Sequence, residues 1–163
     1  MEHEHAFLAP ILMPQGGMYH HRLLLPDEVA DDLHQRSTRR VIGTMNGDRF
    51  DLALHKSKDE GITFLGMSRG RLRALKVGAG DLIEVELSAD PDPDHVEPGP
   101  ELAAALDTYD DAREAWARLT PGRRRSVAWT VNSAKRESTR QSRAAETARR
   151  LADGTHPALH PRR

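Results

Sequence analysis

The chain has 163 residues, a formal net charge of −1, 37% hydrophobic residues and no cysteine. A chain of this length can bury a core without cross-links, and the lack of cysteine excludes disulfides, thiolate metal ligands and a thiol nucleophile. We expect a cytoplasmic protein with no membrane partner, because no stretch approaches the roughly 20 apolar residues of a membrane span and the first residues lack the pattern of a signal peptide.

The first quarter of the chain predicts a hairpin followed by a short helix. Residues 5–13 and 18–25 are apolar runs separated by Pro-Gln-Gly-Gly at 14–17, a typical turn sequence. Pro26 suits the entrance of a helix, and the two acidic residues after it favour the positive end of the helix dipole. We expect this helix to end near His34.

The next segments predict further short strands. Residues 41–45 and 49–54 flank Asn46-Gly47, and an Asn-Gly pair between alternating strands is a strong hairpin signal. Residues 62–67 predict another strand, and residues 69–76 a short basic turn or helix.

The clearest strand covers residues 82–87. Ile83, Val85 and Leu87 alternate with Leu82, Glu84 and Glu86, which predicts one buried and one exposed face. Asp81 precedes this strand, and we expect its carboxylate to accept backbone N–H groups from the preceding turn rather than to act in catalysis.

A proline-rich and acidic connector at residues 90–100 marks the change to helical patterning. Beyond it we predict four helices, at residues 98–106, 109–119, 121–135 and from there to 151. Trp129 is either buried between helix and barrel or, if exposed, a candidate binding aromatic. The predicted domains are a β-barrel domain (1–97), a helical segment (98–154) and a disordered tail (155–163).

Charge is distributed unevenly along the chain. Residues 1–100 contain 11 Lys and Arg against 17 Asp and Glu, whereas residues 101–163 contain 13 against 8. Arginine binds carboxylate and phosphate in a bidentate manner, so the basic region has a candidate ligand site. Its residues are Arg123, Arg124, Lys135, Thr139, Arg140 and Arg143. The same cations could instead clamp the acidic barrel positions Glu84, Glu86 and Asp51, and the sequence leaves both roles open.

We find no recognised catalytic motif in this sequence. His3, His5, His20 and His21 could approach one another if the first two strands pair, but no three-ligand metal pattern appears. There is no Gly-x-Ser-x-Gly elbow and no phosphate-binding loop. We therefore expect a non-catalytic protein with no metal and no cofactor.

Several stretches resemble known bacterial families. Residues 23–29, 41–47 and 77–85 look like the small barrel domain of unknown function DUF1905, and residues 98–106, 109–119 and 126–140 look like the YdeI/OmpD-associated, bacteriocin-protection segment. The resemblance implies a mainly β plus α protein, with a small double-split, AbrB-like β-barrel followed by a C-terminal helical segment. It links the chain to bacteriocin or stress tolerance, which is a phenotype rather than a mechanism.

Two binding functions follow as hypotheses. The first is a cytoplasmic protein that binds an anionic small molecule or protein surface where the basic helices meet the barrel. The second is an AbrB-like nucleic-acid-binding regulator that uses Arg123–Arg125 and the last helix, with strongly salt-dependent affinity. An enzyme ranks third, and the sequence leaves the oligomeric state open.

Overall fold

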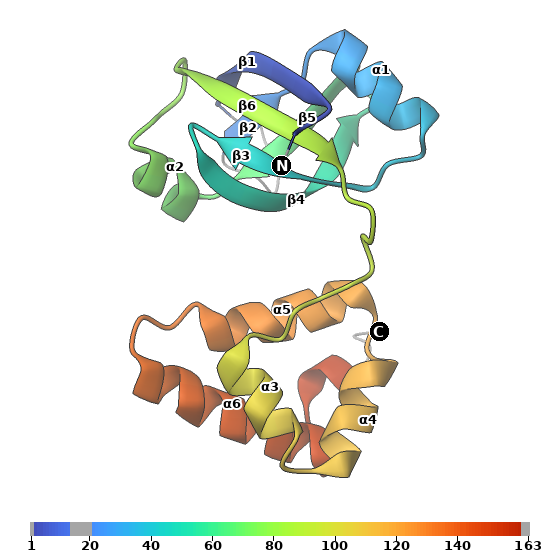
Figure 1. Cartoon of the computed structure of the whole chain (residues 1–163), viewed down its shortest axis with the longest axis vertical. Coiled ribbons are helices and arrows are strands. Elements are labelled where there is room, and N and C mark those ends of the chain that lie inside the picture. The colour runs from blue at the N-terminus through green and yellow to red at the C-terminus, as the bar shows by residue number, and fades with distance from the viewer. Residues whose placement is uncertain (1, 14–20, 161–163) are drawn as a thin grey trace. The chain divides into compact units, whose positions relative to one another are not determined.

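A computed structural model describes residues 2–13 and 21–160 of the chain. The chain divides into two compact units, at residues 1–93 and 94–163, which we call the barrel unit and the helical unit (Figure 1). Each is described by itself.

The barrel unit is a closed antiparallel β-barrel, which confirms the predicted barrel followed by helices. Its strands follow one another around the barrel in the order β1-β2-β5-β4-β3-β6. Their bounds are β1 (His5–Leu12), β2 (His21–Leu24), β3 (Arg40–Met45), β4 (Asp48–Ser57), β5 (Ile62–Met67) and β6 (Leu82–Ala89).

Both predicted hairpin pairings are present. β1 pairs with β2 through Ile11 opposite Leu23, while the turn predicted at residues 14–17 lies outside the described residues. β3 pairs with β4 around Asn46 and Gly47, which have φ values of 47° and 87°. Both positive values are those that an Asn-Gly hairpin turn requires.

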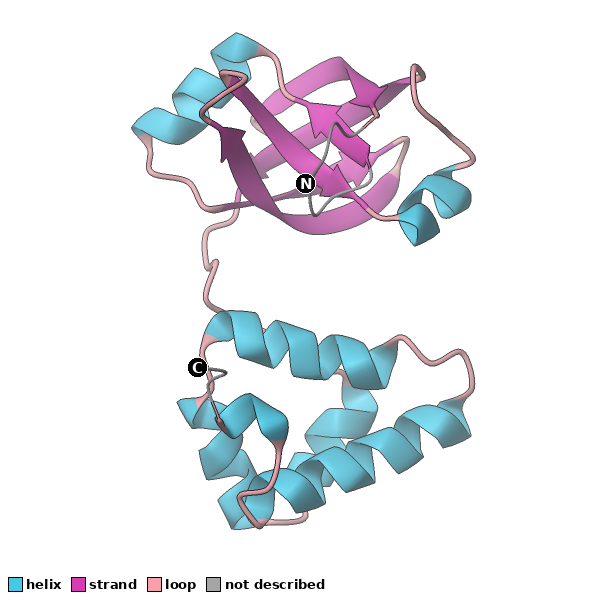
Figure 2. Ribbon diagram, turned by 180° about the vertical axis from the view of Figure 1, so that it is seen from behind, coloured by secondary structure: helices cyan, strands magenta, loops and turns pink. Residues whose placement is uncertain are grey.

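Two helices lie at opposite ends of the barrel (Figure 2). Helix α1 (Asp27–Gln35) begins directly after Pro26 and carries two acidic residues in its first turn, as predicted. Helix α2 (Arg69–Leu75) begins where the Ser68 side chain accepts a hydrogen bond from the Arg71 backbone N–H. It ends at Leu75, and the residue that follows, Lys76, has a positive φ.

The inward faces of the strands form the barrel core. Ile83, Val85 and Leu87 are fully buried, while Leu82 and Glu84 on the other face of β6 are exposed. This is the alternation that the sequence predicts. Asp81 also behaves as expected, because its Oδ2 accepts a hydrogen bond of 2.8 Å from the Gly78 backbone N–H.

Gly43 sets how closely β3 approaches β6. A Cβ placed on Gly43 would lie 1.9 Å from the carbonyl oxygen of Glu86 and 2.8 Å from the Cα of Leu87. Both atoms belong to the backbone of a paired strand, so they cannot move aside as a flexible side chain would. This position therefore requires glycine for close backbone approach.

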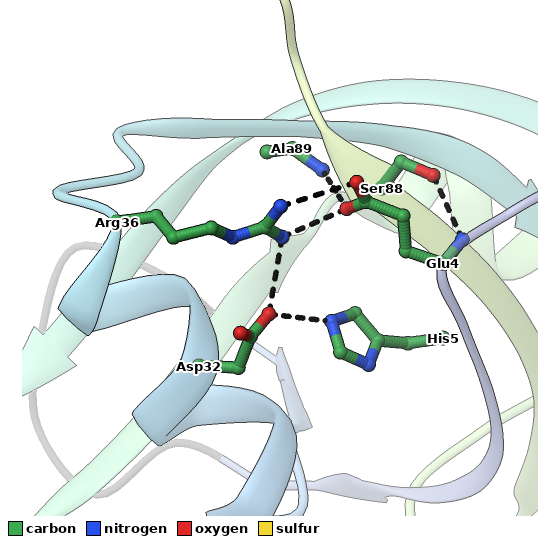
Figure 3. A network of polar contacts seen from close by, with 6 residues as sticks. All are labelled: Glu4, His5, Asp32, Arg36, Ser88 and Ala89. Carbon is green, nitrogen blue, oxygen red and sulfur yellow. Dashed lines mark hydrogen bonds and ion pairs between the residues drawn. The ribbon is translucent and has the colours of Figure 1, made fainter.

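A polar network joins the beginning of β1 to α1 and to the end of β6 (Figure 3). Arg36 donates to both carboxylate oxygens of Glu4, at 3.1 and 2.7 Å, and pairs with Asp32 at 3.1 Å. The Glu4 backbone N–H donates to the Ser88 hydroxyl at 3.0 Å. The hydrogen bond from Arg36 lowers the pKa of Glu4 to about 2. His5 adds a contact of 2.9 Å between its Nε2 and Asp32.

The helical unit contains four α-helices in its described part, and α3, α4 and α5 each contact α6. Their bounds are α3 (Pro100–Leu106), α4 (Asp110–Arg118), α5 (Pro121–Asn132) and α6 (Glu137–Ala152). Within the described ranges, 2–13 and 21–160, no helix has the length and apolar composition to cross a bilayer.

The core of the helical unit is built from leucine, valine and alanine. Leu102, Val131 and Ala148 are fully buried in it, and small alanines let the helices approach closely. Trp129 is not part of this core, since 72% of its surface is exposed, which corresponds to the second of the two alternatives for this residue. At 100° per residue, Trp129 projects almost opposite to the buried positions Val127 and Val131 of the same helix.

The residues after α6 return to the helical unit. The sequence predicts a disordered tail at 155–163, whereas residues 157–159 form a 3₁₀ turn in the structure and Ala158 and Leu159 pack against the core. The backbone N–H groups of Thr155 and His156 both donate to the Arg150 carbonyl. Residues 161–163 lie outside the described part.

The close approach at Gly43 makes a stability prediction. Gly43→Ala should lower the free energy of unfolding by about 1–3 kcal/mol or more, because the new methyl group overlaps the backbone of β6. Urea unfolding measures this loss. Gly78→Ala is the control, since a Cβ there would meet no atom within 4 Å and its φ is not positive. Equal stability of the two variants would contradict the close packing of β3 on β6.

The Glu4 network makes a pH prediction. Because the pKa of Glu4 falls from 4.5 to about 2 on folding, its stabilising effect is complete above pH 4.5 and is lost as the pH falls toward 2. Glu4→Gln should therefore destabilise the protein near pH 7 and have a shrinking effect in acid. We expect less than about 1 kcal/mol, since Glu4 and Arg36 are both about half exposed.

Chemical denaturation of the two proteins from pH 7 to pH 2.5 checks this dependence. Glu2→Gln is the matched control, because Glu2 is exposed and has no ion pair among the described residues. A difference between wild type and Glu4→Gln that is constant with pH would contradict the assignment of the low pKa to this network.

Candidate functional site

A groove of about 720 Å³ lies in the helical unit, between α5, α6 and the residue that precedes the final 3₁₀ turn. We call it the α5–α6 groove. It is lined by Trp129, Thr130, Ser133, Ser142, Arg143, Glu146, Thr147, Arg150 and His156.

Arg143 is the first of two cations in the groove. It is exposed on α6, and its Nη1 donates a hydrogen bond of 2.8 Å to the carbonyl oxygen of Thr130 on α5. This bond holds the guanidinium beside the backbone of the residue that follows Trp129. A guanidinium carries five N–H donors, so most of its hydrogen-bonding capacity remains for a ligand.

Arg150 supplies the second cation and lies in the last turn of α6. Its Nη2 donates a hydrogen bond of 3.0 Å to the Thr155 carbonyl, which ties the chain after α6 back to the helix. Arg150 is partly buried. The two arginines are seven residues apart, and that spacing places them on the same face of a helix.

His156 lies in the wall of the groove as a neutral donor. Its Nδ1 accepts a hydrogen bond of 3.1 Å from the Ala158 backbone N–H, so the neutral imidazole carries its proton on Nε2. Burial lowers the pKa of His156, and the charge of Arg150 lowers it further. The neutral ring is therefore favoured near pH 7.

The groove contains one carboxylate among its lining residues, that of Glu146, and Arg149 neutralises it. Arg149 donates to both oxygens of Glu146, at 2.9 and 3.1 Å, and these hydrogen bonds lower the pKa of Glu146. The other polar lining residues include Ser133 and Ser142, whose hydroxyls can donate or accept a hydrogen bond. Hydrogen-bond donors thus predominate, which suits a ligand that carries only acceptors, such as a carboxylate or phosphate.

Of the candidate residues from the sequence, Arg143 lines the groove and Arg140 serves a different purpose. Arg140 Nε donates to Glu101 Oε1 at 2.8 Å, and its Nη1 donates to the carbonyls of Ala134 and Lys135, both at 3.1 Å. The hydrogen bond from Arg140 lowers the pKa of Glu101. Arg140 therefore joins α3 to the turn between α5 and α6.

The remaining candidates lie apart from the groove lining. Arg124 donates to the carbonyls of Trp116 and Ala117 at the end of α4, and so completes the hydrogen bonding of that helix end. Arg123 is partly buried in the first turn of α5. Lys135 is exposed in the turn before α6, and Thr139 is partly buried in the first turn of α6.

Residues of the predicted clamp between basic helices and acidic strands form ion pairs within their own units. Asp51 pairs with Arg40, which lies on the neighbouring strand of the barrel, at 2.6 Å. Arg140 finds its carboxylate partner, Glu101, on another helix of its own unit. The sequence left open that Arg140 is an internal clamp to acidic residues of the barrel. In the structure it is an internal clamp, and its acidic partner is Glu101 of α3.

Of the N-terminal histidines, His5 makes a structural contact, while the buried Nδ1 atoms of His3 and His21 have no hydrogen-bond partner among the described residues. His5 contacts Asp32 within the network of Figure 3. The predicted approach of His20 to His3 involves a residue, His20, that lies outside the described part of the chain. Among the described residues, no group of three or more His, Asp or Glu side chains could hold a metal ion.

Sequence reasoning named Trp129 as a candidate binding aromatic only if exposed, and it did not bring Trp129, Arg150 and His156 together in one site. For Trp129 a usable signal existed, because the helical projection of α5 places it away from the apolar positions. For His156 there was none, since its place in the groove depends on the backbone hydrogen bonds that return the chain to Arg150.

The contacts of Arg140 predict its effect on stability. Arg140→Gln should lower the Tm by about 5 °C or more, because it leaves Glu101 and two backbone carbonyls without their donor. Lys135→Gln removes the same charge from an exposed side chain and should leave the Tm unchanged within about 1 °C. Thermal unfolding followed by circular dichroism compares the two. Equal Tm values would contradict the role of Arg140 as a clamp.

Comparison with known proteins relates both units to families. Residues 7–87 match the family model described as a domain of unknown function, DUF1905, and residues 96–154 match the model described as "Bacteriocin-protection, YdeI or OmpD-Associated". The chain matches no curated protein and no solved structure at a significant level. The two matches occur in the order that the sequence motifs predict. The chain therefore combines a DUF1905 domain with a segment of the bacteriocin-protection, YdeI or OmpD-associated family.

Proposed function

We propose that this protein is a non-catalytic, cytoplasmic binding protein that takes a small anionic ligand in the α5–α6 groove. The observation that carries the proposal is the excess of hydrogen-bond donors there. Arg143 and Arg150 keep free N–H groups, and His156 presents a third donor at Nε2. A carboxylate or phosphate group satisfies such donors without adding a donor of its own.

The state of the titratable groups in the groove supports binding rather than catalysis. Glu146 is held by Arg149 with a lowered pKa, which makes its carboxylate a weak base. The Nδ1 of His156 is already occupied by a backbone N–H. Neither group is free to take a proton from a substrate at neutral pH.

The arginine contacts favour a small ligand over nucleic acid. Arg124 donates through both Nε and Nη2 to backbone carbonyls, so its guanidinium group is directed at the end of α4. Arg125 also donates to a carbonyl, that of His95. The cluster at residues 123–125 is thus partly used within the fold, and nucleic-acid binding ranks second.

The link to bacteriocin or stress tolerance belongs to this proposal as its biological context. The description of the family that matches the helical unit names bacteriocin protection, and the α5–α6 groove lies within that unit. Binding of an anion would be a molecular activity on which such a phenotype could depend.

An NMR titration with inorganic phosphate at low ionic strength tests the proposal. Phosphate should shift the backbone amide resonances around residues 129–133, 142–150 and 155–156. Arg143→Gln and Arg150→Gln should each weaken the apparent Kd about tenfold, as expected for the loss of a charged hydrogen bond. Arg73→Gln is the charge-matched control, since Arg73 is exposed on α2 in the barrel unit. Unchanged affinity in both groove variants would contradict the proposal.

A further inference from the structure

We infer that the ligand of the α5–α6 groove is a planar aromatic ring bearing a carboxylate or phosphate group, with the ring stacked on Trp129. This inference rests on the proposed function and adds the chemistry of the rest of the ligand. It depends on three features of the groove: its size, the exposure of Trp129, and the position of Arg143 relative to Trp129.

The size of the groove calls for more than a simple anion. Its volume of about 720 Å³ lies within the range of about 300–1,000 Å³ typical of small-molecule sites. A carboxylate or phosphate group bound to Arg143 and Arg150 would fill only a small part of this space. The rest of the volume is available to a larger body attached to the anion.

Trp129 indicates what that body is. It is the most exposed of the large hydrophobic side chains in the described part of the chain, with 72% of its surface accessible. The second tryptophan, Trp116, packs against the core. An indole that is not needed for the core but lines a groove offers a flat apolar face, and flat aromatic rings stack on such a face.

The hydrogen bond between Arg143 and Thr130 places the anion site next to this face. Thr130 follows Trp129 directly in α5, so the guanidinium that contacts the Thr130 carbonyl lies beside the backbone next to Trp129, and both side chains line the same groove. A ligand that joins a ring and an acid group through a short linkage can reach both. The hydroxyls of Ser133 and Ser142, on the two helices that form the groove, can donate to the same acid group.

Two sources of this chemistry can be separated by experiment, namely small aromatic carboxylates and mononucleotides. The full chain is titrated calorimetrically with benzoate and with adenosine monophosphate. Each probe is compared with an anion that lacks the aromatic ring, cyclohexanecarboxylate or ribose 5-phosphate, and with a neutral aromatic, benzamide or adenosine. We expect one of the two aromatic anions to bind about tenfold or more tightly than both of its comparison compounds.

The variant Trp129→Ala tests the stacking directly. It should reduce the affinity for the favoured aromatic anion about tenfold while leaving the affinity for its non-aromatic counterpart unchanged. Trp129→Phe keeps an aromatic face and should recover part of the loss. Since Trp129 is exposed, both variants should remain folded, and the circular dichroism spectrum and Tm confirm this.

The outcomes separate this inference from the proposed function. If Arg143→Gln weakens all anions but Trp129→Ala changes none of them, the groove binds anions and the stacking inference is wrong. If neither aromatic anions nor their non-aromatic counterparts bind below about 10 mM, a level at which binding is too weak to be specific, the proposed function fails as well. Equal binding of neutral and anionic aromatics would also overturn the inference, because it would show that the acid group is not recognised.

Discussion

The guanidinium of Arg140 determines the geometry of the helical unit around its groove. One side chain reaches Glu101 on α3 and the carbonyls of Ala134 and Lys135 in the turn between α5 and α6. The α5–α6 groove lies between the two helices that this turn connects, so Arg140 anchors the connection between them to α3. A partly buried ion pair of this kind is tolerated because backbone carbonyls satisfy the remaining donors.

The arginines of the helical unit divide between support of the fold and exposure to a ligand. The guanidinium groups of Arg140 and Arg124 donate to backbone carbonyls, and Arg149 bridges Glu146 and Asp153. Arg143 and Arg150 each use one N–H on a carbonyl and retain the others. A count of positive charges therefore does not measure the capacity to bind anions, because helix ends and turns use part of it.

The barrel unit is held together by main-chain geometry more than by charge. The approach of β3 to β6 depends on the absence of a side chain at Gly43, and the network of Glu4, Arg36 and Asp32 joins the beginning of β1 to α1 and to the end of β6 (Figure 3). Some acidic residues of this half are paired locally, as Asp51 is with Arg40. Others, such as Glu84 and Glu86 on β6, are exposed.

The sequence by itself determined the architecture. Alternation in residues 82–87, the Asn-Gly turn at 46–47 and the prolines of the connector are local signals, and local backbone preferences suffice to read them. It also shows that residues 101–163 carry an excess of cations. Tertiary structure decided which cations remain available, because the partners of Arg140 and Arg124 lie in other helices. It also decided that Trp129 and His156 share a groove, since only the packing of α5 on α6 and the return of the chain to Arg150 bring them together.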